Sequence, residues 1–148
     1  MKFKTFYTLA EQHDNEVKQT LEKIPKNHRT LVKGYDFKFQ GGHELKNDDG
    51  NIGCVDRKEK TVTVAAPWNY GREYTTLHEI GHLVWDRFMD KKRRSQWEKI
   101  VKSTPMKKTD RQNPEELWSM AYANYFAKNK IVKFTHDTWD KFVAKICS

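Results

Sequence analysis

Apolar side chains recur at three- and four-residue steps near the start of the chain and throughout its second half. This spacing places one apolar face along a helix. It predicts an amphipathic N-terminal helix from Phe6 to Ile24 that ends before Pro25. In the second half, helices are expected in "YTTLHEIGHLVWD" (74–86), "SQWEKIVKS" (95–103), "NPEELWSMAYANYFAKN" (113–129) and "THDTWDKFVAKI" (135–146).

A strand-like alternation lies between the two helical regions. Tyr35, Phe37 and Phe39 alternate with polar residues, and so do Val62 and Val64 in "KTVTVAAP". Period-two alternation is typical of a strand with one buried face, so two short strands are expected. The Gly-, Asn- and Asp-rich segment between them is expected to be a connection. The predicted fold is therefore α+β, with a small mixed β-sheet packed on the "HEIGH" helix and a predominantly helical C-terminal half.

The length and composition favour one folded domain over a disordered chain. The chain has 148 residues, which corresponds to a single domain spanning 1–148. Aromatic residues make up 13% of it, enough for a core, although 32% of the residues are charged. The sequence contains neither a signal-peptide core nor a run of about 18 apolar residues. We therefore expect a cytoplasmic protein without a membrane-spanning segment.

The net charge of +8 would favour an anionic partner such as nucleic acid. Basic residues are scattered, however, and the one dense run, "KKRR" (91–94), is expected near the end of the histidine helix, where cations offset the helix dipole. The sequence has no zinc-finger spacing, no RNA-binding aromatic signature and no basic region leading into heptads. Nucleic acid is therefore not expected as a partner and is kept only as a minor alternative.

The two cysteines, Cys54 and Cys147, lack the close spacing of a metal-binding pair. They are expected to be reduced thiols rather than a metal clip or a disulfide. A metal ion would therefore have to be held by histidine and carboxylate side chains.

The segment "HEIGH" contains the strongest chemical signal in the chain. His78 and His82 are one helical turn apart, so both imidazoles can fill corners of a tetrahedral Zn2+ site. Glu79, rotated by about 100 degrees per residue, can reach a zinc-bound water as general base without binding the metal. Gly81 allows another main chain, from the protein or from a substrate, to approach closely. The alternative is that both histidines only pack or face solvent.

The third ligand is less defined by the sequence. A metzincin needs Gly three residues and His six residues after the second histidine, where this chain has Trp85 and Phe88, so that class is excluded. Glu115 and Glu116 begin a later helix and are candidates for a ligand. Asn113 is a good N-cap for that helix, and Glu116 could instead close a capping box with it. The local sequence fits either role.

The pair of segments "HEIGHLVWD" and "EELWSMAYANYF" resembles the catalytic domain of anthrax lethal factor and its relatives, which include the Pro-Pro endopeptidases. These are compact gluzincin zinc metallopeptidases. The resemblance implies a zinc-dependent endopeptidase with His78, His82 and Glu116 as metal ligands and Glu79 as general base. The strand "TVTVAA" resembles the edge strand of that family, along which an extended peptide or protein substrate lies. We also expect a monomer.

Two positions depart from the pattern of that family. It has a tyrosine shortly before the ligand glutamate to stabilise the oxyanion, where this chain has Thr109. It also has a second acid after that glutamate, in the region of Ser119 and Met120. Three residues from elsewhere in the chain are candidates to replace that tyrosine as the hydrogen-bond donor to the oxyanion: Tyr70, Tyr74 and His136.

Two further functions are kept as alternatives. "AYANYFAKN" resembles a helix of the small intracellular zinc peptidases that cleave phage and mobile-element repressors, although an acid would be needed where Met120 or Tyr122 stands. A non-catalytic zinc-binding interaction module would use the same groove without hydrolysis. Bound zinc without peptide cleavage would distinguish this module from an enzyme.

Overall fold

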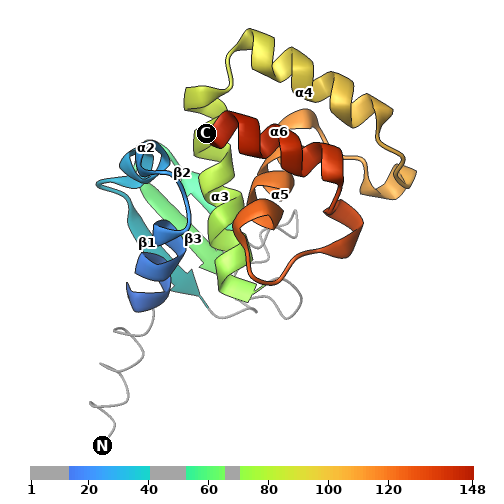
Figure 1. Ribbon diagram of the computed structural model, residues 1–148. Coiled ribbons are helices and arrows are strands. Elements are labelled where there is room, and N and C mark those ends of the chain that lie inside the picture. Colours follow the sequence, from blue (N-terminus) through green and yellow to red (C-terminus); the bar gives the residue numbers. More distant parts are fainter. Residues whose placement is uncertain (1–13, 41–52, 66–70) are drawn as a thin grey trace, which may run out of the picture.

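The computed structural model describes residues 14–40, 53–65 and 71–148. Helix α3 (Gly71–Phe88) lies between a small sheet and the C-terminal helices (Figure 1). The expected α+β fold class is thereby confirmed. The N-terminal helix is confirmed for residues 14–22, whereas its expected first part, from Phe6 to His13, lies outside the described residues.

The sheet is mixed, as predicted. Its strands β1 (Asp36–Gln40), β2 (Gly53–Asp56) and β3 (Thr61–Ala65) lie in the order β1-β3-β2. Strand β3 pairs parallel with β1 and antiparallel with β2. The side chains of Val62 and Val64 are fully buried, which explains why alternation revealed this strand.

Two expectations for this sheet are wrong. The segment between β1 and β3 is not only a connection, because it contains β2, whose glycine and aspartate are uncommon in strands. In addition, β3 is not the edge strand, because β1 pairs with one side of it and β2 with the other. Its main-chain groups are therefore already paired within the sheet, so a peptide cannot add to it. Of the strands that the structure describes, β1 and β2 form the edges.

The packing of α3 on α5 (Pro114–Phe126) joins the two halves of the molecule. A side-chain Cβ at Gly81 would lie 3.0 Å from Ser119 Cα, so the two helices meet without an intervening side chain. The indole Nε1 of Trp118 donates to Gly81 O at 3.1 Å. The main chain that Gly81 admits is therefore that of α5.

The basic run 91–94 begins a new helix instead of ending α3, which corrects the prediction. Helix α3 ends at Phe88, and Asp90 caps α4 (Lys91–Ser103) by accepting from Arg93 N at 2.9 Å. The guanidinium of Arg93 nevertheless turns back and donates to Phe88 O at 2.8 Å. Cations do therefore satisfy carbonyl groups at the end of α3, but they come from the following helix.

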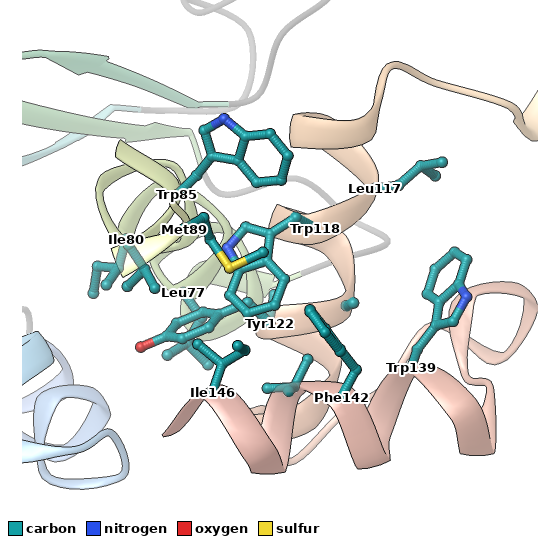
Figure 2. Close-up of a cluster of buried hydrophobic side chains, with 14 of the residues drawn as sticks. Leu77, Ile80, Trp85, Met89, Leu117, Trp118, Tyr122, Trp139, Phe142 and Ile146 are labelled. Carbon is teal, nitrogen blue, oxygen red and sulfur yellow. The ribbon is translucent and has the colours of Figure 1, made fainter. Parts of the chain in front are cut away.

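Three buried tryptophans, one each from α4, α5 and α6 (Asp137–Cys147), form the centre of the helical half. Trp97 of α4 lies with its ring centroid 5.7 Å from that of Trp118 and 5.3 Å from that of Trp139. Figure 2 shows Trp118 between residues of α3 and Phe142 of α6. The three C-terminal helices predicted from apolar spacing are thus confirmed as α4, α5 and α6.

The remaining described elements are one short helix and three 3-10 turns: α2 (Lys26–Arg29), η1 (Thr30–Val32), η2 (Lys108–Asp110) and η3 (Val132–Phe134). Among the helices of residues 14–40 and 71–148, none is both long enough and apolar enough to cross a bilayer.

Substitution of Gly81 by valine tests the close contact between α3 and α5. Because even a Cβ would press on the Ser119 main chain, Gly81→Val should lower the free energy of unfolding by about 1–3 kcal/mol, measured by urea denaturation. Arg87→Val, at an exposed position of the same helix, controls for the lower helix propensity of valine. Equal stabilities of the two variants would contradict the contact.

Candidate metal centre

Helix α3 presents His78, Glu79 and His82 toward one end of α5. The imidazole centroids of His78 and His82 are 5.0 Å apart, as expected for residues one helical turn apart. One donor atom from each of the three side chains can be chosen so that all lie within 4.8 Å of one another. Two of the predicted ligands, His78 and His82, and the predicted base, Glu79, are therefore brought together.

Glu116 of α5 lies against the same two histidines. Its Oε2 is 3.2 Å from His78 Nε2, and its Oε1 is 3.0 Å from His82 Nε2. The N-cap is present as well, because Asn113 Oδ1 accepts from Glu116 N at 2.9 Å. The main chain and the side chain of Glu116 thus have separate partners: its N–H donates to the N-cap residue Asn113, and its carboxylate faces the histidines.

Glu115 contacts the opposite side of the His82 ring. Its Oε2 is 2.7 Å from His82 Nδ1. The two adjacent acids therefore bond to different nitrogens of one imidazole. Of these two acids, Glu116 is the one that contacts both histidines.

Glu79 lies beneath strand β2 and is 5% exposed. A Cβ at position 53 would lie 2.6 Å from Glu79 Oε1, so any other residue there would require this carboxylate to move. Gly53 was not identified from the sequence, because its strand was taken for a connection. A glycine in a strand can mark close approach of another group, and this was the signal available.

A cavity of about 370 Å³ opens beside these side chains. Strand β2 forms one wall, and the acids of α5 form another. The remaining lining residues are Arg57, Tyr74, Met120, Ile131 and Phe134. Arg57 forms an ion pair with Asp86 of α3 and was also missed by the sequence analysis.

The three residues considered as oxyanion donors lie in different places. Tyr74 lines the cavity, and its hydroxyl is 3.4 Å from Met120 O. His136 packs against Trp139, with ring centroids 4.5 Å apart and ring planes tilted by 55°, and is not among the lining residues. Tyr70 lies outside the described residues. Of the two described candidates for the oxyanion donor, Tyr74 is therefore the one that lines the cavity.

Burial and charge shift the pKa values of this cluster in opposite directions. Burial raises the pKa of Glu79, and the charges of His78 and His82 oppose that rise. Burial would lower the pKa of His82, but the hydrogen bond to Glu116 and the charge of Glu79 outweigh it and raise this pKa to about 9. Hydrogen bonds from both histidines hold the pKa of Glu116 well below its usual range. In the metal-free protein, a protonated His82 thus offsets part of the negative charge of the acids.

The donor set fits a zinc ion. Zinc is held by imidazole nitrogen and carboxylate oxygen at about 2.0–2.2 Å, so neighbouring donors of a tetrahedral site are about 3.4 Å apart. The separations of 3.2 and 3.0 Å between Glu116 oxygens and the two Nε2 atoms are slightly shorter. Cys54 also lines the cavity, but partial burial and the charge of Glu79 raise the pKa of its thiol, which disfavours the thiolate that binds metals.

Comparisons of the chain with protein-family models, with curated proteins and with solved structures found no match. The function must therefore be inferred from the residues of this chain and their geometry.

The raised pKa of His82 predicts a specific pH dependence in the metal-free protein. The unfolded value is about 6.5, so this contribution to stability is fully present below pH 6.5 and is lost as the pH rises through about 9. At about 1.4 kcal/mol per pKa unit, the loss is of the order of 3 kcal/mol. An NMR titration with chelator present should give a His82 midpoint near 9, and urea unfolding should show the loss of stability except in His82→Ala. A midpoint at or below 6.5 would contradict this account of the cluster.

Proposed function

We propose that the protein is a zinc-dependent endopeptidase in which His78, His82 and Glu116 bind the metal and Glu79 is the general base. The main support is that the Nε2 atoms of both histidines converge on the Glu116 carboxylate, at 3.2 and 3.0 Å. The sequence of α5 contains no other acid except Glu115, which contacts the far nitrogen of His82. This favours Glu116 as the third ligand.

The chemistry follows from the positions of these side chains. Bound zinc would polarise the peptide carbonyl and lower the pKa of a water toward about 7. Glu79 takes a proton from the attacking water and transfers it to the leaving amine. Its burial, which raises the pKa of the carboxyl, suits a group that must hold this proton between the two transfers.

The substrate is proposed to be an extended peptide, but its strand partner differs from the one expected. Strand β3 is interior, whereas β2 is an edge strand of the described sheet and lines the cavity. A peptide chain added along β2 would form main-chain hydrogen bonds and pass above Glu79. Tyr74, a lining residue of the same cavity, is the proposed donor to the developing oxyanion, and its hydroxyl would give up its contact with Met120 O to make that bond.

The direct test is metal content combined with cleavage of a diverse peptide library. Purified protein should contain about one zinc per chain, and it should lose cleavage with a chelator and regain it when zinc is restored. Zinc binding without cleavage of any peptide would contradict the endopeptidase and favour the non-catalytic module. Absence of zinc binding would contradict the metal centre itself.

Substitution of Glu79 by glutamine should separate metal binding from catalysis. Glutamine keeps the size of the side chain but cannot accept the proton of the water, so kcat should fall by about 10²- to 10⁴-fold. Zinc content should remain that of the wild type, because no ligand is lost. Wild-type turnover in zinc-loaded Glu79→Gln protein would rule out Glu79 as the base.

Substitution of Gly53 by alanine should displace the base without changing any polar group. The new Cβ would lie 2.6 Å from Glu79 Oε1, so the carboxylate has to move. A displacement of about 1 Å can cost about 10²-fold in rate, and kcat/KM should fall accordingly while zinc affinity is kept. Lys58→Ala, in the exposed turn after β2, is the control. Equal kcat/KM values for both variants would show that Gly53 does not position Glu79.

A further inference from the structure

The contact between Glu115 and His82 has no role in the proposed function. Glu115 Oε2 lies 2.7 Å from His82 Nδ1, whereas Glu116 contacts the other ring nitrogen, Nε2. A histidine that binds a metal through one nitrogen commonly donates the N–H of the other to a carboxylate. This second bond fixes the tautomer and the orientation of the ring.

We propose that Glu115 is a positioning residue that holds the His82 ring with Nε2 directed at the metal. The inference rests on the proposed function, because it requires a metal at the Nε2 atoms. Glu115 accepts the Nδ1–H of His82, and this leaves Nε2 without a proton and free to bind zinc. It touches neither the metal nor the substrate carbonyl.

The first turn of α5 is held firmly enough for this role. Asn113 caps the turn through Glu116 N, and Pro114 O accepts a hydrogen bond of 2.8 Å from the buried indole of Trp97. Glu115 follows Pro114 directly, so its main chain is held on both sides. Adjacent helical residues point about 100 degrees apart, which lets Glu115 and Glu116 reach opposite edges of one ring.

A simpler interpretation is that Glu115 only offsets the dipole of α5, as a carboxylate in a first helical turn does. The proposed role differs from it in a measurable way. A dipole effect changes the stability of the fold, whereas a positioning role changes the affinity for zinc and the state of His82 Nδ1. Asp137, an exposed acid in the first turn of α6 that pairs with Lys141, is the control for loss of a first-turn carboxylate away from the metal centre.

Zinc affinity is measured by competition with a chromophoric chelator for the wild type, Glu115→Ala, Glu115→Gln, Glu116→Ala and Asp137→Ala. Glu115→Ala should bind zinc about 10- to 100-fold more weakly than the wild type. Glu115→Gln should lose less zinc affinity than Glu115→Ala, because its amide oxygen still accepts from Nδ1–H. If the alanine variant fails to fold, the zinc affinity of the glutamine variant decides the result. Glu116→Ala should show the largest loss of zinc affinity, because a ligand is removed. The zinc affinity of Asp137→Ala should remain within about twofold of the wild-type value.

A second measurement reports on His82 itself. In the zinc-loaded wild type, NMR of the ¹⁵N-labelled imidazole should show a His82 Nδ1–H protected from exchange, and this signal should disappear in Glu115→Ala. Wild-type zinc affinity in both Glu115 variants, with weak binding in Glu116→Ala, would overturn the inference and leave the proposed function standing. Equal losses in Glu115→Ala and Glu116→Ala, with a ligand missing from the zinc X-ray absorption spectrum of each, would make Glu115 a ligand instead. Absence of zinc binding by the wild type would overturn both proposals.

Discussion

The close approach of α3 and α5 at Gly81 determines where the polar side chains of the centre meet. Gly81 lies between the two histidines on α3, and Ser119 lies one turn after Glu116 on α5. A Cβ at Gly81 would lie 3.0 Å from Ser119 Cα, so the main chains of the two helices approach closely here. A short glutamate at the start of α5 can therefore reach both imidazoles. A larger residue at Gly81 would move the acids away from the histidines.

This contact also explains the electrostatic state of the metal-free centre. Three carboxylates, Glu79, Glu115 and Glu116, lie around two histidines in a partly buried site, and two of these acids accept hydrogen bonds from His82. Protonation of His82 partly compensates the negative charge. A divalent cation would do so more completely, and the proton on Nε2 would leave as the metal binds. The same carboxylates thus stabilise a protonated His82 imidazole in the metal-free protein. They would stabilise a divalent cation when a metal ion is bound.

The sequence predicted those features that depend on local periodicity. Helices α3 to α6 follow from apolar spacing, and the proximity of His78, Glu79 and His82 follows from helical geometry alone. Strand β2 was not predicted, because its four residues adopt the strand conformation by pairing with β3, and its glycine and aspartate have little β propensity of their own. The edge position of β3 was predicted wrongly for the same reason, since strand order depends on which segments pair in space. Gly53 and Arg57 were missed because both belong to the β2 region.

The roles of the two acids on α5 also depended on three-dimensional information. The sequence offered a capping box or a metal ligand for Glu116, and the geometry allows the cap through its main-chain N–H while the side chain faces the histidines. Nothing in the sequence indicated that Glu115 would reach His82 Nδ1. Helical spacing predicts that the side chains of Glu115 and Glu116 point in different directions. It does not predict that the His82 ring lies between their carboxylates.

A crystal structure of the zinc-loaded protein, with anomalous diffraction at the zinc edge, would test whether His78, His82 and Glu116 hold one zinc ion. We expect one strong anomalous peak at about 2.0–2.2 Å from the Nε2 atoms of both histidines and from one Glu116 oxygen, with Glu79 outside that distance. A peak coordinated by Glu115 or Cys54 in place of Glu116, or no peak beside the histidines, would contradict it.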